Sequence, residues 1–162
     1  MIKLKINSSK ACSGQFIIET MYIEIKHFHS IIAYLSLALL IFAIVFTVYG
    51  WLSKKPFTNN NKIIALIGLA AIHTQVLFGL ILYFLSPLGL SNFSGAAMKD
   101  ATSRLYMLEH PFVMIIAVVL ITIGYSKANR LVDDVSKYKK IVIFYSIGLV
   151  LILSRIPWSV WF

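Results

Sequence analysis

Four long apolar runs, separated by short polar segments, set the pattern of this chain. They cover about residues 30–50, 63–85, 104–124 and 141–158. Each run holds about twenty residues, and a helix of that length crosses a hydrocarbon core of about 30 Å. The segments between them contain Pro, Asn and Ser, which favour turns and helix starts. The pattern predicts an all-α membrane protein in which four transmembrane helices form an up-down bundle.

The first twenty residues do not share this pattern. Residues 1–20 hold no apolar segment long enough for a signal peptide, and they are polar and aperiodic. Met21 then begins the stretch MYIEIKHFHS, which reads naturally as a protein start. We expect residues 1–20 to be a disordered tail or a start assigned too early, and residues 21–162 to form a single transmembrane domain.

The composition agrees with a membrane protein. Hydrophobic residues make up 59% of the chain and charged residues 13%, whereas soluble domains are about 45–50% apolar and about a quarter charged. The net charge of +9 comes from residues between the apolar runs, where they act as topology signals and contact anionic lipid. We therefore expect the lipid bilayer, and no nucleic acid, as a partner. The single cysteine, Cys12, excludes an internal disulfide framework and a cysteine-rich metal site.

The distribution of Lys and Arg predicts the orientation. The basic residues of the two short linkers are Lys54, Lys55, Lys62, Lys127, Arg130, Lys137, Lys139 and Lys140. Loops rich in Lys and Arg face the cytoplasm, so both linkers are expected there. The long loop 86–103 and both termini would then face outward. The lysines of residues 1–20 oppose this orientation, unless that segment is not made.

Three histidines lie in or beside the apolar runs. His29 precedes the first run, His73 lies inside the second, and His110 lies between Glu109 and Pro111 at the start of the third. An ionisable side chain at membrane depth is costly and indicates a functional site. Histidines on different membrane helices suggest a metal or a haem iron between them.

The expected depth of each histidine in the membrane ranks the possible pairs of haem ligands. Counted from the cytoplasmic helix ends at about 1.5 Å per residue, His73 lies roughly 16 Å, His110 roughly 22 Å and His29 roughly 30 Å deep. His73 and His110 are the best-matched axial ligands for one haem b, and His29 with His110 is the next pair. His27 and His29 are two residues apart and point to different helix faces, so at most one faces the bundle.

Other side chains near the third run extend this hypothesis. Arg155 is expected at the height of His110, where its forked donors suit a haem propionate. Glu109 would meet either Arg155 or a propionate. Met107, His110 and Met114 share one face of the third run, and thioether with imidazole suits copper or a His/Met haem.

Each of these residues also has a structural interpretation. His73 would bond water or a hydroxyl such as that of Thr74, His110 would lie at the membrane interface, and the methionines would simply pack. Arg155 would extend to the outer surface. Three glycines are expected to allow close helix approach: Gly68, Gly79 and Gly124. The chain has no Gly-rich phosphate loop, no Ser-His-Asp order and no paired carboxylates at membrane depth, so the sequence does not support a hydrolase.

Several segments resemble a known family. HFHS, GWLSKKPFT, AAIHTQVLFGLILYFLSP, FSGAAMKD and LEHPFVMIIAVVLITIG are similar to segments of small bacterial four-span membrane proteins catalogued as cytochrome-b-like. The similarity covers about Met21 to the end of the chain. The histidine positions resemble, more loosely, those of heme A synthase halves. The resemblance implies a haem-binding four-helix bundle in the bacterial inner membrane, with His29, His73 and His110 as the positions to carry over. Larger cytochrome b bundles hold two haems with two histidine pairs, for which this chain has too few core histidines.

The expected function follows from these observations. We expect an integral membrane protein that binds one haem b between the second and third apolar helices, with the first as an alternative donor. It would transfer electrons, as a carrier or subunit rather than an independent enzyme, with other membrane redox subunits or a quinone as partners. The alternatives are a non-haem structural or assembly protein and a copper- or haem-handling factor.

Overall fold

The computed structural model describes the backbone of residues 2–158 and the side chains of residues 16–158. Its long helices are α1 (Ile2–Leu52), α2 (Asn59–Leu85), α4 (His110–Asn129) and α5 (Asp134–Ser154). The loop between α2 and α4 contains a 3₁₀ turn η1 (Leu90–Asn92), a short α3 (Ala101–Arg104) and a π-helical turn η2 (Leu105–Glu109). The described part of the chain is therefore all-helical, as the apolar pattern predicts.

Three helical segments are long and apolar enough to cross a membrane. They are Phe16–Leu52, Asn59–Leu85 and Ala101–Asn129, the last of which joins α3, η2 and α4. α5 is absent from this set among the described helices. Its first turns contain Lys137, Lys139 and Lys140, which leave a shorter apolar run. The structure thus supports a membrane protein with three candidate spans.

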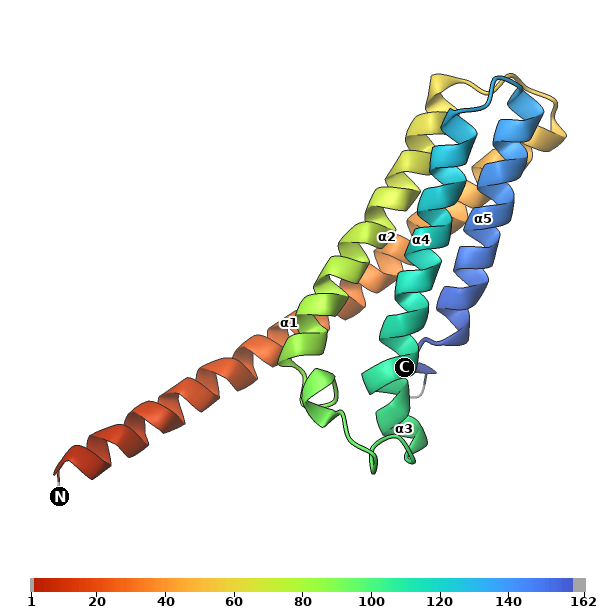
Figure 1. Cartoon of the computed structure of the whole chain (residues 1–162). Coiled ribbons are helices and arrows are strands. Elements are labelled where there is room, and N and C mark those ends of the chain that lie inside the picture. Colours follow the sequence, from red (N-terminus) through yellow and green to blue (C-terminus); the bar gives the residue numbers. More distant parts are fainter. Residues whose placement is uncertain (1, 159–162) are drawn as a thin grey trace.

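The long helices pack side by side in pairs. α1 contacts α2 and α5, and α4 contacts the same two helices. The N-terminal part of α1 extends beyond the other helices (Figure 1). The segment expected to be a disordered tail or an early-assigned start continues α1 as helix from Ile2. A translation start at Met21 stays a prediction.

Glycines allow the helices to approach closely. A Cβ atom added to Gly68 of α2 would lie 3.0 Å from the Cβ of Ala43 on α1, and one added to Gly148 of α5 would lie 2.5 Å from Ile121 of α4. A Cβ at Gly124 of α4 would collide with the Cβ of Phe144 on α5. The predicted role of Gly68 and Gly124 in close packing is confirmed.

Hydroxyl groups join the helices inside this packing. The Ser36 hydroxyl of α1 donates to the carbonyl oxygen of Ala71 on α2 over 3.0 Å, and Ser36 is buried. The hydroxyl of Tyr145, a fully buried residue of α5, donates to the carbonyl oxygen of Ala65 on α2 over 2.8 Å. Hydrocarbon offers no hydrogen-bond partners, so these bonds favour one register between the helices.

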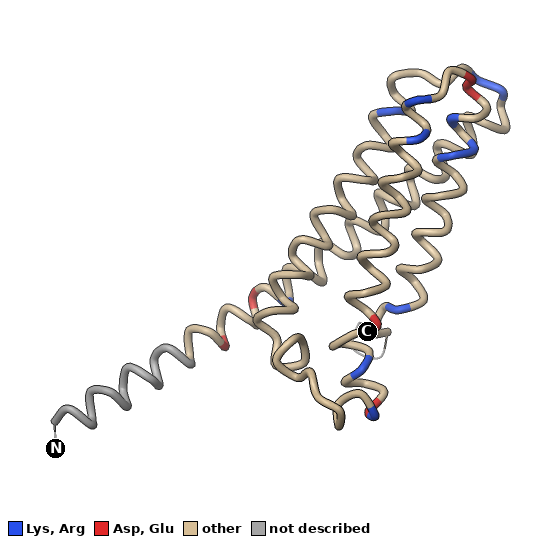
Figure 2. Tube along the Cα trace, in the orientation of Figure 1, with Lys and Arg blue, Asp and Glu red and all other residues tan. Residues whose placement is uncertain are grey.

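The two basic linkers meet at one end of the molecule. The Tyr138 hydroxyl of α5 donates to the carbonyl oxygen of Pro56 in the α1–α2 linker over 3.2 Å, and its ring lies 5.0 Å from that of Phe57. The Lys137 ammonium lies 5.6 Å from the centre of the Phe57 ring. Figure 2 shows a cluster of Lys and Arg at this end and a smaller group at the opposite end, which holds α3. The linkers therefore lie on the same side of any membrane that the helices cross.

Candidate functional site

His29 and His110 face each other at the end of the molecule opposite the basic linkers. His29 lies on α1, and His110 is the first residue of α4. Their ring centres are 6.4 Å apart, and the two ring planes meet at 81°. Both side chains are half-buried. The structure thus brings together His29 and His110, the pair that expected depth ranked second as haem ligands.

Gln75 of α2 holds His29. Its amide nitrogen donates to the carbonyl oxygen of His29 over 3.0 Å and lies 3.2 Å from Nδ1 and 3.3 Å from Nε2 of the same ring. The amide oxygen of Gln75 is buried and has no partner, the one such side-chain atom in the described part of the chain. Unpaired buried polar atoms are rare in native structures and often mark a functional site.

Gly79, one turn after Gln75, flanks the same ring. A Cβ atom at this position would lie 3.0 Å from Cε1 of His29. The predicted role of Gly79 in close packing is confirmed, and the group that it approaches is an imidazole. Any larger residue at this position would press on His29.

The spacing of residues on α2 explains why Gln75 faces inward. The buried residues Gly68 and Ile72 precede Gln75 and Gly79 at intervals of four, three and four residues, which is one helix face. His73 is two residues from Gln75 and therefore points about 200° away around the helix. Only one of His73 and Gln75 can face the bundle, and here it is Gln75.

The start of α4 is shaped by Pro111. Proline has no N–H group to bond the carbonyl oxygen four residues earlier, which belongs to Met107. The Tyr83 hydroxyl of α2 donates to this oxygen over 3.0 Å. The N–H group of His110 instead donates five residues back, to the carbonyl oxygen of Leu105, and closes the π-helical turn. Such turns are frequent at functional sites, and this one orients Glu109 and His110.

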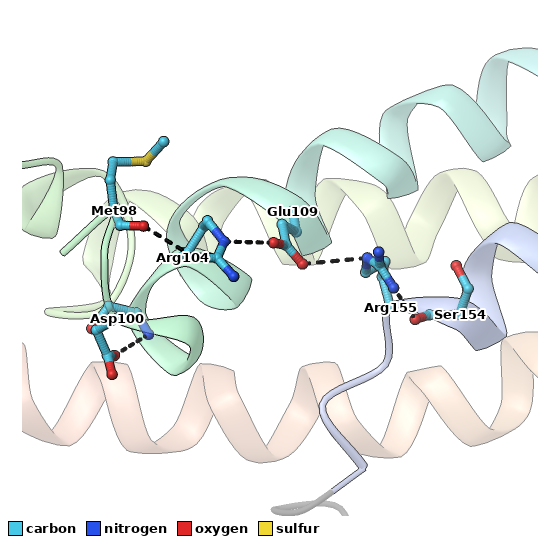
Figure 3. A network of polar contacts seen from close by, with 7 residues as sticks. Met98, Asp100, Arg104, Glu109, Ser154 and Arg155 are labelled. Carbon is cyan, nitrogen blue, oxygen red and sulfur yellow. Dashed lines mark hydrogen bonds and ion pairs between the residues drawn. The ribbon is translucent and has the colours of Figure 1, made fainter. Parts of the chain in front are cut away.

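A small charge network lies beside His110 (Figure 3). One carboxylate oxygen of Glu109 lies 2.8 Å from Nε of Arg104, and the other lies 3.3 Å from Nε of Arg155. Nδ1 of His110 donates to the carbonyl oxygen of Arg155 over 2.8 Å. The prediction that Glu109 meets Arg155 is confirmed. The two guanidinium groups and one carboxylate give this network of three side chains a net charge of +1.

The structure places His73 away from this site. Its side chain is exposed, Nδ1 donates to the carbonyl oxygen of Leu69 over 2.9 Å, and Nε2 lies 3.4 Å from the hydroxyl of Thr122 on α4. Thr122 comes twelve residues after His110, which is about 18 Å along a helix. The structure therefore does not bring His73 and His110 together, and the predicted pair is wrong. The prediction rested on depth along each helix, which does not tell in which direction a side chain points.

The other candidate residues contribute less. His27 is exposed while His29 is half-buried, as expected for residues on different faces. Met107 is fully buried, and Met114 packs against the apolar core, which fits the packing interpretation of the methionines. No group of three or more His, Cys, Asp or Glu side chains among the described residues could hold a metal ion.

Four residues of this site were not predicted from the sequence as site residues: Gln75, Gly79 as a neighbour of His29, Tyr83 and Arg104. The first three lie on α2, and Arg104 ends α3. A signal for them exists, because Gln75 is a polar residue on the same face as Gly68 and Ile72. His73, which lies two residues before Gln75, was predicted as the site residue of this helix instead.

Comparisons with known proteins add no family to these observations. No family model, no curated protein and no solved structure matches the chain.

Proposed function

We propose that this chain is an integral membrane, cytochrome-b-like protein in which His29 of α1 and His110 of α4 would together hold one haem b. It would transfer single electrons as a carrier or as a subunit of a larger redox assembly. The observation that carries this proposal is the separation of 6.4 Å between the two imidazole rings. Two imidazoles that bind one metal ion from opposite sides, with bonds of about 2.0 Å, hold their centres roughly 6 Å apart.

The hydrogen bonds of His110 suit a metal ligand. A carbonyl oxygen only accepts hydrogen bonds, so Nδ1 of His110 carries the hydrogen and donates it to the main-chain oxygen of Arg155. Nε2 therefore keeps its lone pair. Ligating histidines usually donate their other ring N–H to a carbonyl or carboxylate, which fixes ring orientation. His110 meets this requirement through the main chain at the end of α5.

Gln75 and Gly79 of α2 flank the His29 ring. Gly79 leaves room for the ring itself, which lies 3.0 Å from where a Cβ atom would be. A histidine that binds iron through one ring nitrogen donates the N–H of the other, so the buried amide oxygen of Gln75, in place of the amide nitrogen that now lies 3.2 Å from Nδ1, would accept that N–H. These residues would hold and orient the ligand and exclude lipid from its flank.

The charge network of Arg104, Glu109 and Arg155 would bind the haem propionates. Arg104 and Arg155 share Glu109, which leaves one guanidinium charge for a propionate. Arg155 is the more exposed of the two, with 46% of its side chain accessible, and can move to a new partner without leaving a buried site. The bound haem supplies one-electron redox chemistry, and the chain sets its potential through ligands, burial and these charges.

The proposed membrane arrangement uses all four long helices in an up-down bundle. α5 is the fourth span, because Tyr145 and Ile141 are buried against the other helices and Tyr138 anchors its lysine-rich start at the basic end. Both basic linkers face the cytoplasm of a bacterial inner membrane. The histidine pair and the long loop 86–103 then lie at the outer side, where a soluble or membrane-bound redox partner can approach.

A visible spectrum of the purified protein tests the proposal. We expect a Soret band with α and β bands after reduction, and about one haem per chain. His29→Ala and His110→Ala should each abolish or strongly shift these bands, while His73→Ala, as the matched control, should keep them. A wild-type preparation that stays colourless when expressed with added haem would contradict the proposal.

A further inference from the structure

The proposed haem site does not use His73, which lies on the outward surface of α2. His73 is fourteen residues after Asn59, about 21 Å along a helix that is about 40 Å long. Its side chain is exposed near the middle of this candidate span. A polar ring in that position faces hydrocarbon, which is costly and indicates a function.

One nitrogen of the ring lacks a donor. Nδ1 of His73 donates to the carbonyl oxygen of Leu69 over 2.9 Å, so Nε2 carries the lone pair. Nε2 lies 3.4 Å from the Thr122 hydroxyl. That hydroxyl has one hydrogen, which it already donates to the carbonyl oxygen of Val118 over 2.6 Å. Nε2 is therefore an acceptor that faces lipid without a full hydrogen bond.

We propose that Nε2 of His73 accepts a hydrogen bond from the hydroxyl group of an uncharged, lipid-soluble hydroquinone that binds between α2 and α4. Charged lipid headgroups stay at the membrane surface, whereas an uncharged aromatic head can reach the middle of a span. The apolar side chains of Leu77 on α2 and Val119 on α4 are exposed about one helix turn from the histidine and threonine, both toward the end that holds α3. They provide the walls on which an aromatic ring would lie.

The two hydroxyl groups beside His73 already donate within their own helices. The Thr74 hydroxyl donates to the carbonyl oxygen of Ala70 over 3.0 Å, and the Thr122 hydroxyl donates to Val118. A second copy that packed His73 against these two threonines would bring acceptors together and no free hydroxyl hydrogen. A ligand with its own hydroxyl satisfies Nε2, and the choice of a redox-active hydroxyl compound rests on the proposed function.

Nitrogen NMR of the full-length protein in phosphatidylcholine nanodiscs tests this site. The histidines are labelled with ¹⁵N, and the His73 resonances are identified by their loss in His73→Leu. Decyl-hydroquinone, kept reduced, should shift the Nε2 resonance of His73 saturably. Its dimethyl ether, which has the same ring and tail but no hydroxyl hydrogen, should leave the resonance in place. His27→Leu, which removes another exposed histidine, should not change the response.

Three outcomes would overturn the proposal. Neither compound shifts the resonance, or both shift it equally, or the resonance moves with the protein-to-lipid ratio before any compound is added. The last result would identify a second copy as the occupant. The His73 resonance is read independently of the Soret band, so loss of the haem proposal and loss of this one are separate results.

Discussion

The ring of His110 donates a hydrogen bond from Nδ1 to the main-chain oxygen of Arg155, 2.8 Å away. This bond joins the start of α4 to the end of α5 and leaves the lone pair of Nε2 free. The same two residues meet again through Glu109, which lies 3.3 Å from the Arg155 guanidinium. The end of α5 therefore orients the imidazole that the proposed haem site needs.

Replacing Gln75 should weaken haem binding without removing the ligands. Gln75→Leu removes the amide that contacts the His29 ring at 3.2 Å, and loss of such outer partners typically costs about 10–100-fold in metal affinity. Haem titration of the purified variant measures the effect. Thr74→Val is the matched control, because the Thr74 hydroxyl bonds only within its own helix. Equal affinities for Gln75→Leu and the wild type would contradict a positioning role.

A side chain at Gly79 should displace His29. Gly79→Val adds a Cβ only 3.0 Å from Cε1 of the ring, so the ring or α2 must move. We expect a reduced haem content and a lower melting temperature than for Gly95→Val, because an added Cβ at Gly95 meets no atom within 4 Å. Absorbance and thermal unfolding report both effects. A Gly79→Val protein with the haem content of the control would be inconsistent with close packing at this ring.

The Tyr83 hydroxyl should stabilise the fold only because Pro111 is present. Tyr83→Phe leaves the carbonyl oxygen of Met107 without its donor, at a cost of about 1 kcal/mol, the typical net value of a hydrogen bond. In a Pro111→Ala background the new N–H group can bond this oxygen, so the cost of Tyr83→Phe should largely disappear. A double-mutant cycle on the free energy of unfolding measures the coupling. Additive effects would mean that the proline does not create the need for Tyr83.

Acid should loosen the start of α5. Hydrogen bonds from Ser136 to Asp133, one of them from its main-chain N–H at 2.7 Å, hold the pKa of the Asp133 carboxyl below its usual value of 3.8. A depressed folded-state pKa contributes stability that is present above about pH 3.8 and is lost as the pH falls through the folded value. The protection of the Ser136 amide, which is its exchange rate relative to the intrinsic rate at the same pH, should therefore fall in acid. In Asp133→Asn this pH dependence should vanish, and its persistence would assign the effect to another group.

The helices were predictable from the sequence because apolar runs of about twenty residues have few alternatives. The residues at which the helices begin and end were harder to predict. α2 begins at Asn59 rather than near residue 63, because the N–H of Thr58 donates to the side chain of Asn61 and starts the helix within a polar stretch. α5 ends at Ser154, before the expected residue 158, where Pro157 follows within one turn.

The site was predicted only in part, and for a physical reason. His29 and His110 were among the candidates, but depth alone ranked His73 above His29. Helix rotation decides which side chain faces inward, and it depends on how Gly68 and Ile72 pack. The carbonyl oxygen of Met107, which Pro111 leaves without a main-chain donor, is bonded by Tyr83, which lies 24 residues away in sequence. Neither relationship is visible in a local pattern.

The central claim is that His29 and His110 together bind one iron. Electron paramagnetic resonance of the oxidised protein tests it most directly, because two imidazole ligands give a low-spin ferric signal. We expect that signal in the wild type and in His73→Ala, and a high-spin signal or no haem in His29→Ala and His110→Ala. A low-spin signal that is lost in His73→Ala but kept in His29→Ala would contradict the account.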